Sequence, residues 1–191
     1  VCMGRRAKYL LIKLQQGSLL IHLGMSGSLR LLLADEIWRK HDHIEMVLHT
    51  GKRLRYHDPR RFGSWSWATG DHYQLAKLGP EPLSKQLNGE YLYKKARGRM
   101  VPVKNFIMSS DIVVGVGNIY AAESLFSAGI RPDRSAGRIS LKRFCILSEH
   151  IKNVLGSAID QGGTTLRDFV DSSGEPGYFK QQLQVYGRHG K

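Results

Sequence analysis

The sequence predicts an α+β fold in which a β-rich part precedes a helical part. Three observations predict it. Apolar residues alternate or run together through residues 1–78. Two prolines and two glycines lie between Gly79 and Gly89, and apolar residues then recur at helical spacing in residues 89–191. Several short strands in the first part suggest a sandwich or barrel. We therefore expect a β domain over 1–78, a linker over 79–88 and a helical domain over 89–191.

Two hairpins and a tryptophan-containing strand are predicted in the first domain. Residues 8–33 are rich in Leu and Ile, with QQGS as a hairpin turn. In residues 41–58 apolar and polar residues alternate, and TGK turns the chain back. Trp65 and Trp67 are two positions apart, which places both on one face of a short strand.

Four helices are predicted in the second domain, each with a start or stop signal. Asn88 is a plausible cap for the helix in NGEYLYKKAR, and Pro102 suits the first turn of the helix in VPVKNFIM. The helix in NIYAAESLF stops at Gly129. The longest helix is capped by Ser140 and ends at the glycine pair 162–163.

Charge is the strongest signal in the composition. Twenty-nine Lys and Arg against sixteen Asp and Glu give a net charge of +13 and a pI near 10.0. Residues 51–100 alone carry eleven basic and four acidic residues. A polyanionic partner, most often nucleic acid, fits this balance. A basic surface kept for solubility or for an acidic protein partner is the alternative.

Several classes of protein are disfavoured by the sequence. No apolar run approaches the roughly 18 residues of a membrane span, so we expect a soluble, cytoplasmic protein without a leader. The two cysteines, Cys2 and Cys145, fit a reducing compartment and cannot form a four-thiolate zinc site. The four histidines within residues 41–57 lack acidic or thiolate partners at a known spacing, so no metal site is expected in this chain.

The segment VVGVGNIY, residues 113–120, resembles a phosphate-binding turn but fails the tests for a nucleotide site. Tyr120 replaces the third glycine of a dinucleotide motif, and the Lys-Ser/Thr end of a P-loop is absent. Free amides at a helix N-terminus, with Asn118 facing outward, suit a DNA phosphate at least as well as a cofactor. A tight helix–helix turn capped by Asn118 is the alternative.

Of three further motifs, one allows two interpretations and the other two have an ordinary structural explanation. In DPRRFG, one interpretation is that Arg60 and Phe62 supply a guanidinium and a ring that enter a base stack. The alternative is a solvated pair of arginines, Arg60 and Arg61, with Phe62 in the core. Met25 in HLGMSGSL lies on a turn, where methionine is usually core filler. Lys8 in GRRAKYLL is commonly a solvated charge at a strand edge.

Taken in order along the chain, these segments resemble one family, the bacterial formamidopyrimidine-DNA glycosylases, relatives of endonuclease VIII. The motifs that carry the resemblance are GRRAKYLL, IHLGMSGSLR, KHDH, LRYHDPRRFG, LGPEPL, VVGVGNIYAAESLFSAGI, GGTTLRDF and PGYFKQQLQVYGR. The resemblance implies a partial N-terminal β-sandwich joined to a helix–two-turn–helix (H2TH) DNA-binding domain. It also implies a monomer whose partner is double-stranded DNA that contains oxidised purines or abasic sites.

The resemblance implies DNA-binding roles for four residues of the first domain. Met25, Arg60 and Phe62 would fill and wedge the gap left by an extruded nucleotide, with Arg60 facing the orphaned cytosine. Lys8 would contact the phosphates that flank the lesion.

In the second domain the resemblance implies further DNA-binding residues. Lys104 and Asn118 would grip backbone phosphates near the lesion, and Glu123 would support the helix that Asn118 begins. Residues 164–178 would close on the flipped base, and Arg167 stands where relatives carry Lys or Arg.

The resemblance also implies chemistry that this chain does not contain. Members of the family attack the sugar C1′ with the secondary amine of an N-terminal proline and form an imine that drives β- and δ-elimination, with a neighbouring glutamate handling protons. The chain begins inside the expected β-sandwich and stops before the family's four-cysteine zinc hairpin. We therefore expect a fragment that holds no zinc and is inactive alone, from an active parent glycosylase/lyase that holds one structural zinc.

Two rival classes stay open at this point. One is a non-catalytic module that binds damaged DNA, and the other is a basic protein associated with RNA or ribosomes. The second rival predicts no preference for duplex that carries an abasic site.

Overall fold

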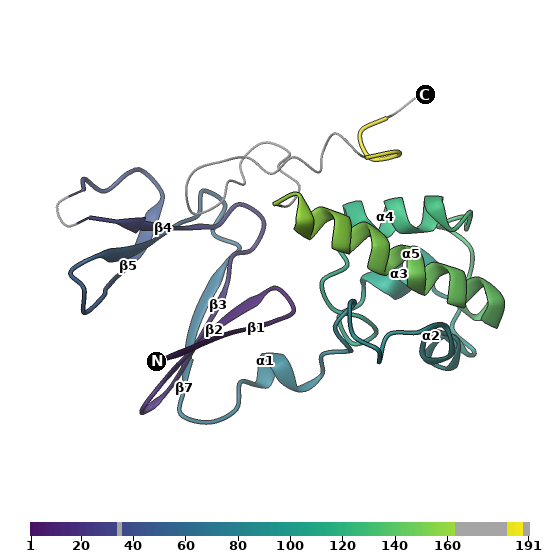
Figure 1. The fold of residues 1–191 in the computed structure, drawn as a ribbon, viewed down its shortest axis with the longest axis horizontal. Coiled ribbons are helices and arrows are strands. Elements are labelled where there is room, and N and C mark those ends of the chain that lie inside the picture. The colour runs from purple at the N-terminus through teal and green to yellow at the C-terminus, as the bar shows by residue number, and fades with distance from the viewer. Residues whose placement is uncertain (34–35, 163–182, 189–191) are drawn as a thin grey trace. The chain divides into compact units, whose positions relative to one another are not determined.

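The computed structural model describes residues 1–33, 36–162 and 183–188 of the chain (Figure 1). These residues divide into two compact units, which we call the β unit, residues 1–71 with 161–162, and the helical unit, residues 72–160 with 183–188. The predicted order, strands first and helices second, is confirmed. Across the described parts of the chain, none of the helices has both the length and the apolar character that a membrane span requires.

The first sheet of the β unit has four antiparallel strands in the order β1-β2-β3-β7. Its strands are β1 (Cys2–Arg6), β2 (Tyr9–Leu14), β3 (Gly17–His22) and β7 (Ser64–Ala68). The predicted QQGS turn joins β2 to β3. Because Arg6 pairs with Tyr9, the turn between β1 and β2 consists of two residues, Ala7 and Lys8.

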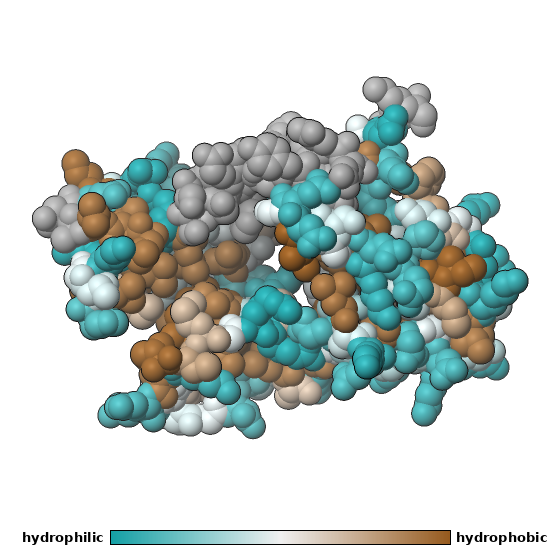
Figure 2. All heavy atoms as spheres, viewed as in Figure 1, coloured by the Kyte–Doolittle hydropathy of each residue, from teal (hydrophilic) through white to brown (hydrophobic). Residues whose placement is uncertain are grey.

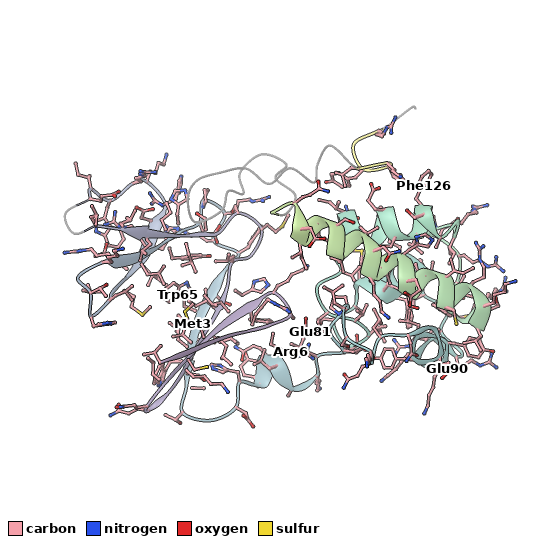
Figure 3. All side chains as sticks on the ribbon, viewed as in Figure 1. Met3, Arg6, Trp65, Glu81, Glu90 and Phe126 are labelled. Carbon is pink, nitrogen blue, oxygen red and sulfur yellow. The ribbon has the colours of Figure 1, made fainter. Side chains whose placement is uncertain are left out.

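The second sheet has three antiparallel strands in the order β4-β6-β5. Its strands are β4 (Ser28–Leu32), β5 (Asp42–Val47) and β6 (Arg53–His57). The rings of Tyr56 on β6 and Trp65 on β7 lie 5.8 Å apart, so the two sheets share an apolar interior (Trp65 is labelled in Figure 3). Apolar residues also reach the visible surface of this unit (Figure 2), and Leu31 and Val47 are among the exposed ones.

The helical unit contains the predicted helices and two short elements that the sequence pattern did not predict. The elements are α1 (Tyr73–Ala76), α2 (Gly89–Ala96), α3 (Val103–Met108), α4 (Asn118–Ser127), the 3₁₀ helix η1 (Ala136–Arg138) and α5 (Leu141–Asp160). The cap at Asn88 is confirmed, because its Oδ1 accepts a 2.8 Å hydrogen bond from the amide of Tyr91. Gly129 has φ +62°, a conformation that ends α4 and favours glycine.

The core of the helical unit forms around α5, which is amphipathic. Phe144, Leu147, Ile151 and Leu155 follow one another at intervals of three and four residues and are buried against the other helices. The segment 79–88, predicted as a linker, packs on this unit, and its Leu87 is fully buried in the same core.

Candidate nucleic-acid interface

Two adjacent loops of the β unit present the residues expected to enter a base stack. Met25 lies between β3 and β4 and is 66% exposed, while Phe62 lies between β6 and β7 and is 63% exposed. Arg60 is exposed on the same loop as Phe62. Neither apolar side chain fills the core of the described structure, so both remain accessible to a partner.

A buried carboxylate, Asp58, connects these two loops. The Ser26 hydroxyl donates a 2.6 Å hydrogen bond to its Oδ1, and the Tyr56 hydroxyl donates a 2.9 Å bond to its Oδ2. The backbone amides of Arg60 and Gly63 donate to the same carboxylate at 3.3 and 2.9 Å. Ser26 follows Met25 directly, and the two amides flank Phe62, so one carboxylate fixes both presenting loops.

The ionisation of Asp58 follows from this arrangement. Burial alone would raise its pKa, but the hydrogen bonds from Ser26, the Gly63 amide and Tyr56 outweigh burial and lower the pKa from 3.8 to about 2. Burial and the neighbouring Asp58 charge raise the pKa of Tyr56. Asp58 is therefore a charged acceptor and Tyr56 a neutral donor at neutral pH.

Close backbone contact also holds the two loops together. Gly24 has φ +67°, and a Cβ there would lie 2.6 Å from the carbonyl carbon of Phe62. A Cβ on Gly63 would overlap the Tyr56 hydroxyl. Glycine is required at both positions because a side chain would push the loops apart.

Lys8 and His22 form a second polar group in the β unit. Lys8 lies at the tip of the β1–β2 turn, where partial burial lowers its pKa. Burial and then the Lys8 charge lower the pKa of His22. The Gly24 amide donates a 3.0 Å hydrogen bond to His22 Nδ1, so the neutral ring carries its proton on Nε2. The Nε2–H of His22 is thereby available as a donor beside Lys8. The sequence pattern did not predict a role for His22.

Many of the basic residues of the three-stranded sheet serve its interior and not a partner. Arg55 is 1% exposed, donates to Glu45 at 2.6 and 2.9 Å, and lies 4.8 Å from the Trp38 ring centroid. Arg30 donates a 2.6 Å hydrogen bond to the buried Asp42. Burial raises the pKa of Asp42, but hydrogen bonds that include the one from Arg30 lower it overall.

The VVGVGN turn places Asn118 at the start of α4. Gly115 has φ +82°, which explains the first glycine. Gly117 is the N-cap residue, and no side chain caps the helix. Asn118 is the first helical residue and its side chain is exposed, so the capping alternative does not describe this turn. The amides of the first turn of a helix lack partners within it and form a site for an anion.

Lys104 lies on the neighbouring helix of the same unit. It occupies the first turn of α3, is half-buried, and its amide donates to the carbonyl of Pro132 at 3.2 Å. Helices α3 and α4 pack against each other, so Lys104 and Asn118 come from contacting elements.

Glu123 on α4 is 3% exposed and holds the C-terminal segment of the helical unit. Its Oε2 accepts a 2.8 Å hydrogen bond from the Gln184 amide. Its Oε1 accepts bonds from the amides of Val185 and Tyr186 at 3.0 and 2.9 Å. Glu123 thus fixes a segment some sixty residues away in sequence. The sequence pattern did not predict this contact. The DNA-binding role of Glu123 stays a prediction. Arg167 and residues 164–178 lie outside the described residues.

The fold and these loops place the protein among the DNA glycosylases of base-excision repair. Residues 1–65 match the family described as the formamidopyrimidine-DNA glycosylase N-terminal domain, and residues 78–170 match the formamidopyrimidine-DNA glycosylase H2TH domain. The chain therefore belongs to the formamidopyrimidine-DNA glycosylase family, and the resemblance that its motifs indicate is confirmed.

Individual relatives agree with this assignment. The chain is 60% identical to the formamidopyrimidine-DNA glycosylase of Alcanivorax borkumensis, over 100% of this chain and 72% of the relative. It is 56% identical to that of Photobacterium profundum, over 98% of this chain and 70% of the relative.

Solved structures with similar folds come from the same family. The crystal structure of the MutM (Fpg) protein from Thermus thermophilus superposes with a TM-score of 0.89 at 36% identity, over 98% of this chain and 71% of that one. The Lactococcus lactis Fpg in complex with abasic-site DNA superposes with a TM-score of 0.90 at 31% identity, over 99% of this chain and 71% of that one.

Proposed function

We propose that the protein containing these residues excises oxidised purines, such as 8-oxoguanine and formamidopyrimidines, from duplex DNA and cleaves the abasic strand by β,δ-elimination. The observation that carries the proposal is the exposure of Met25, Arg60 and Phe62 on two loops that Asp58 holds together. An enzyme that acts on a base must first take it out of the stack, and a rigid wedge lowers the cost of unstacking.

The substrate class is supported by what relatives bind. The Lactococcus lactis relative was solved with DNA containing Fapy-dG, and a MutM relative with DNA containing carbocyclic 8-oxo-G. In this chain, Phe62 and Met25 would wedge the step that the lesion leaves, and the Arg60 guanidinium would hydrogen-bond the unpaired base opposite.

Each unit, taken by itself, offers groups that would contact DNA phosphates. On the β unit the ammonium of Lys8 and the Nε2–H of His22 would bind phosphates. On the helical unit the amides of the first turn of α4, the Asn118 side chain and Lys104 would do so. We further propose that the protein acts as a monomer in the bacterial cytoplasm, at the nucleoid.

The reacting nucleophile is not among residues 1–191. All six prolines of the chain are internal, so each ring nitrogen belongs to a peptide bond and is not a free secondary amine. We therefore propose that the chain 1–191 by itself binds lesion DNA without forming the imine.

The residues present also do not fit the zinc site that the family resemblance implies. The chain has two cysteines, Cys2 on β1 and Cys145 on α5, and both are exposed. Four thiolates are needed for such a site. We propose that the full-length protein holds one structural zinc through other residues.

Borohydride trapping with 8-oxoguanine duplex tests the proposal. The full-length protein with its N-terminal proline is expected to give a covalent crosslink, and the chain 1–191 is expected to give none while still preferring abasic-site duplex to undamaged duplex. A crosslink with the chain 1–191 would refute its proposed inactivity. Absence of any preference for abasic-site duplex would favour the RNA-associated alternative.

A further inference from the structure

The helical unit carries a second concentration of positive charge. We call it the α2–η1 surface and define it by six exposed residues: Lys94, Lys95, Arg97, Arg99, Arg134 and Arg138. They lie in residues 94–104 and 131–143, which together hold ten basic residues and one acidic residue. Figure 2 shows hydrophilic residues over much of the visible face of this unit.

Backbone hydrogen bonds join the two stretches into one layer. The Gly137 amide donates to the Arg99 carbonyl at 2.9 Å, and the Val103 amide donates to the Arg134 carbonyl at 2.8 Å. Lys104 follows Val103 directly. The α2–η1 surface is therefore continuous with Lys104, which is expected to bind a phosphate near the lesion.

Neutral groups hold three of the four arginines of this surface in place. Arg97 donates a 3.0 Å hydrogen bond to the Tyr93 hydroxyl, and its guanidinium lies 5.3 Å from the centroid of that ring. Arg99 Nε donates to the carbonyl of Lys95 at 3.0 Å, and Arg134 donates to a carbonyl in η1 at 3.4 Å. Such partners orient a guanidinium without cancelling its charge.

Carboxylates contribute little to this surface. Among the residues that the structure describes, Arg99 is the one member with a carboxylate partner, Asp111, at 4.0 Å between exposed side chains. Helix α2 has one acidic residue, Glu90, in its first turn (labelled in Figure 3), whereas Arg97 is the C-cap residue at the other end of the helix. The surface therefore keeps most of its positive charge for a partner.

We propose that the α2–η1 surface binds the phosphate backbone of duplex DNA that extends beyond the lesion site. The inference rests on the proposed function, because the surface continues from Lys104. DNA phosphates repeat along a strand, so a row of oriented guanidinium groups gains one contact, and releases about one counterion, for each phosphate that it meets.

The test compares salt dependence of binding on abasic-site duplexes of about 12 and about 30 base pairs. The full-length protein is titrated by fluorescence anisotropy as wild type and as the triple variant Arg97→Gln, Arg134→Gln, Arg138→Gln. A second triple variant replaces the same three arginines with Lys and keeps the charge. A matched control removes three exposed charges elsewhere: Lys13→Gln, Lys52→Gln, Lys85→Gln.

On the long duplex, the glutamine variant is expected to reduce the magnitude of the negative slope of log K against log salt by up to about 2.7, or about 0.9 for each lost contact. The short duplex, the lysine variant and the control should give wild-type slopes. An unchanged slope on the long duplex overturns the proposal and favours an acidic protein partner. An equal loss on both duplexes, or an equal loss in the control, overturns it as well.

Failure of the proposed function gives a different result. If the wild type does not prefer abasic-site duplex, the lesion-specific function is refuted, while the same slope comparison on undamaged long duplex still decides whether the surface binds DNA.

Discussion

Replacing Asp58 with Asn tests the central contact of the two loops. The substitution keeps the shape of the side chain but removes its charge, and one oxygen acceptor becomes an amide nitrogen that faces donors. Ser26 and the Arg60 amide bond one carboxylate oxygen, and Tyr56 and the Gly63 amide bond the other, so one of these pairs of donors would lose its acceptor. Because the group is fully buried, water does not replace the lost acceptor.

The expected cost follows from the pKa of Asp58. Folding lowers it from 3.8 to about 2. At 1.36 kcal/mol per pKa unit, the charge stabilises the folded state by about 2.5 kcal/mol at pH 7. A depressed carboxyl pKa stabilises above the unfolded pKa and loses this effect as pH falls through the folded pKa. The contribution should therefore drop to about half at pH 3 and to about 0.4 kcal/mol at pH 2.

Tryptophan fluorescence during urea unfolding measures the stability of the β unit, which contains Asp58. The chain has three tryptophans, Trp38, Trp65 and Trp67, and all three lie in the β unit. Wild type and Asp58→Asn are unfolded at several pH values between about 7 and 2, and their free energies of unfolding are subtracted. The exposed Asp71 supplies a matched control, Asp71→Asn, which should remain close to wild type throughout.

The test is decided by how the difference in free energy of unfolding between wild type and Asp58→Asn varies with pH. Carboxylates such as Asp42 titrate in wild type and variant alike, so the subtraction isolates Asp58. A difference that stays constant from pH 7 to pH 2 would refute the assigned pKa, and a difference below about 0.5 kcal/mol at pH 7 would show that the carboxylate does not hold the loops.

Three other predictions concern the remaining contacts. Glu123→Gln should reduce hydrogen-exchange protection of the amides of residues 184–186, because a neutral amide accepts more weakly than a carboxylate; unchanged protection would contradict the contact. Gly115→Ala should destabilise the folded protein by about 1 kcal/mol in thermal melts, because Gly115 has a positive φ. Gly156→Ala, inside α5, should instead stabilise the folded protein by up to about 1 kcal/mol. Phe62→Ala should change stability by less than about 0.5 kcal/mol, yet weaken binding of abasic-site duplex by about tenfold or more in a titration.

Local features of the sequence predicted much of the fold. Asn88 identified a helix start because a cap acts within three residues, and the spacing from Phe144 to Leu155 identified α5 because a helix repeats every 3.6 residues. The hairpin at QQGS followed from a turn signal between apolar runs. The motifs in register indicated the family.

The candidate site was only partly visible in the sequence. Met25, Arg60, Phe62 and Asn118 were found through their motifs, but whether the two apolar residues were exposed or in the core could not be decided from spacing. Burial depends on which segments pack over a side chain, and those segments are distant in sequence.

What the sequence alone determined is therefore the order of elements, the helix cap at Asn88 and the family, while the contacts of individual residues with DNA stay predictions. The tertiary structure decided which residues hold distant segments in place. Asp58 meets a serine 32 residues away, and Glu123 meets amides 61 to 63 residues away. A buried carboxylate anchors distant segments only where folding brings enough donors to outweigh the cost of removing it from water, and no local pattern records which donors those are.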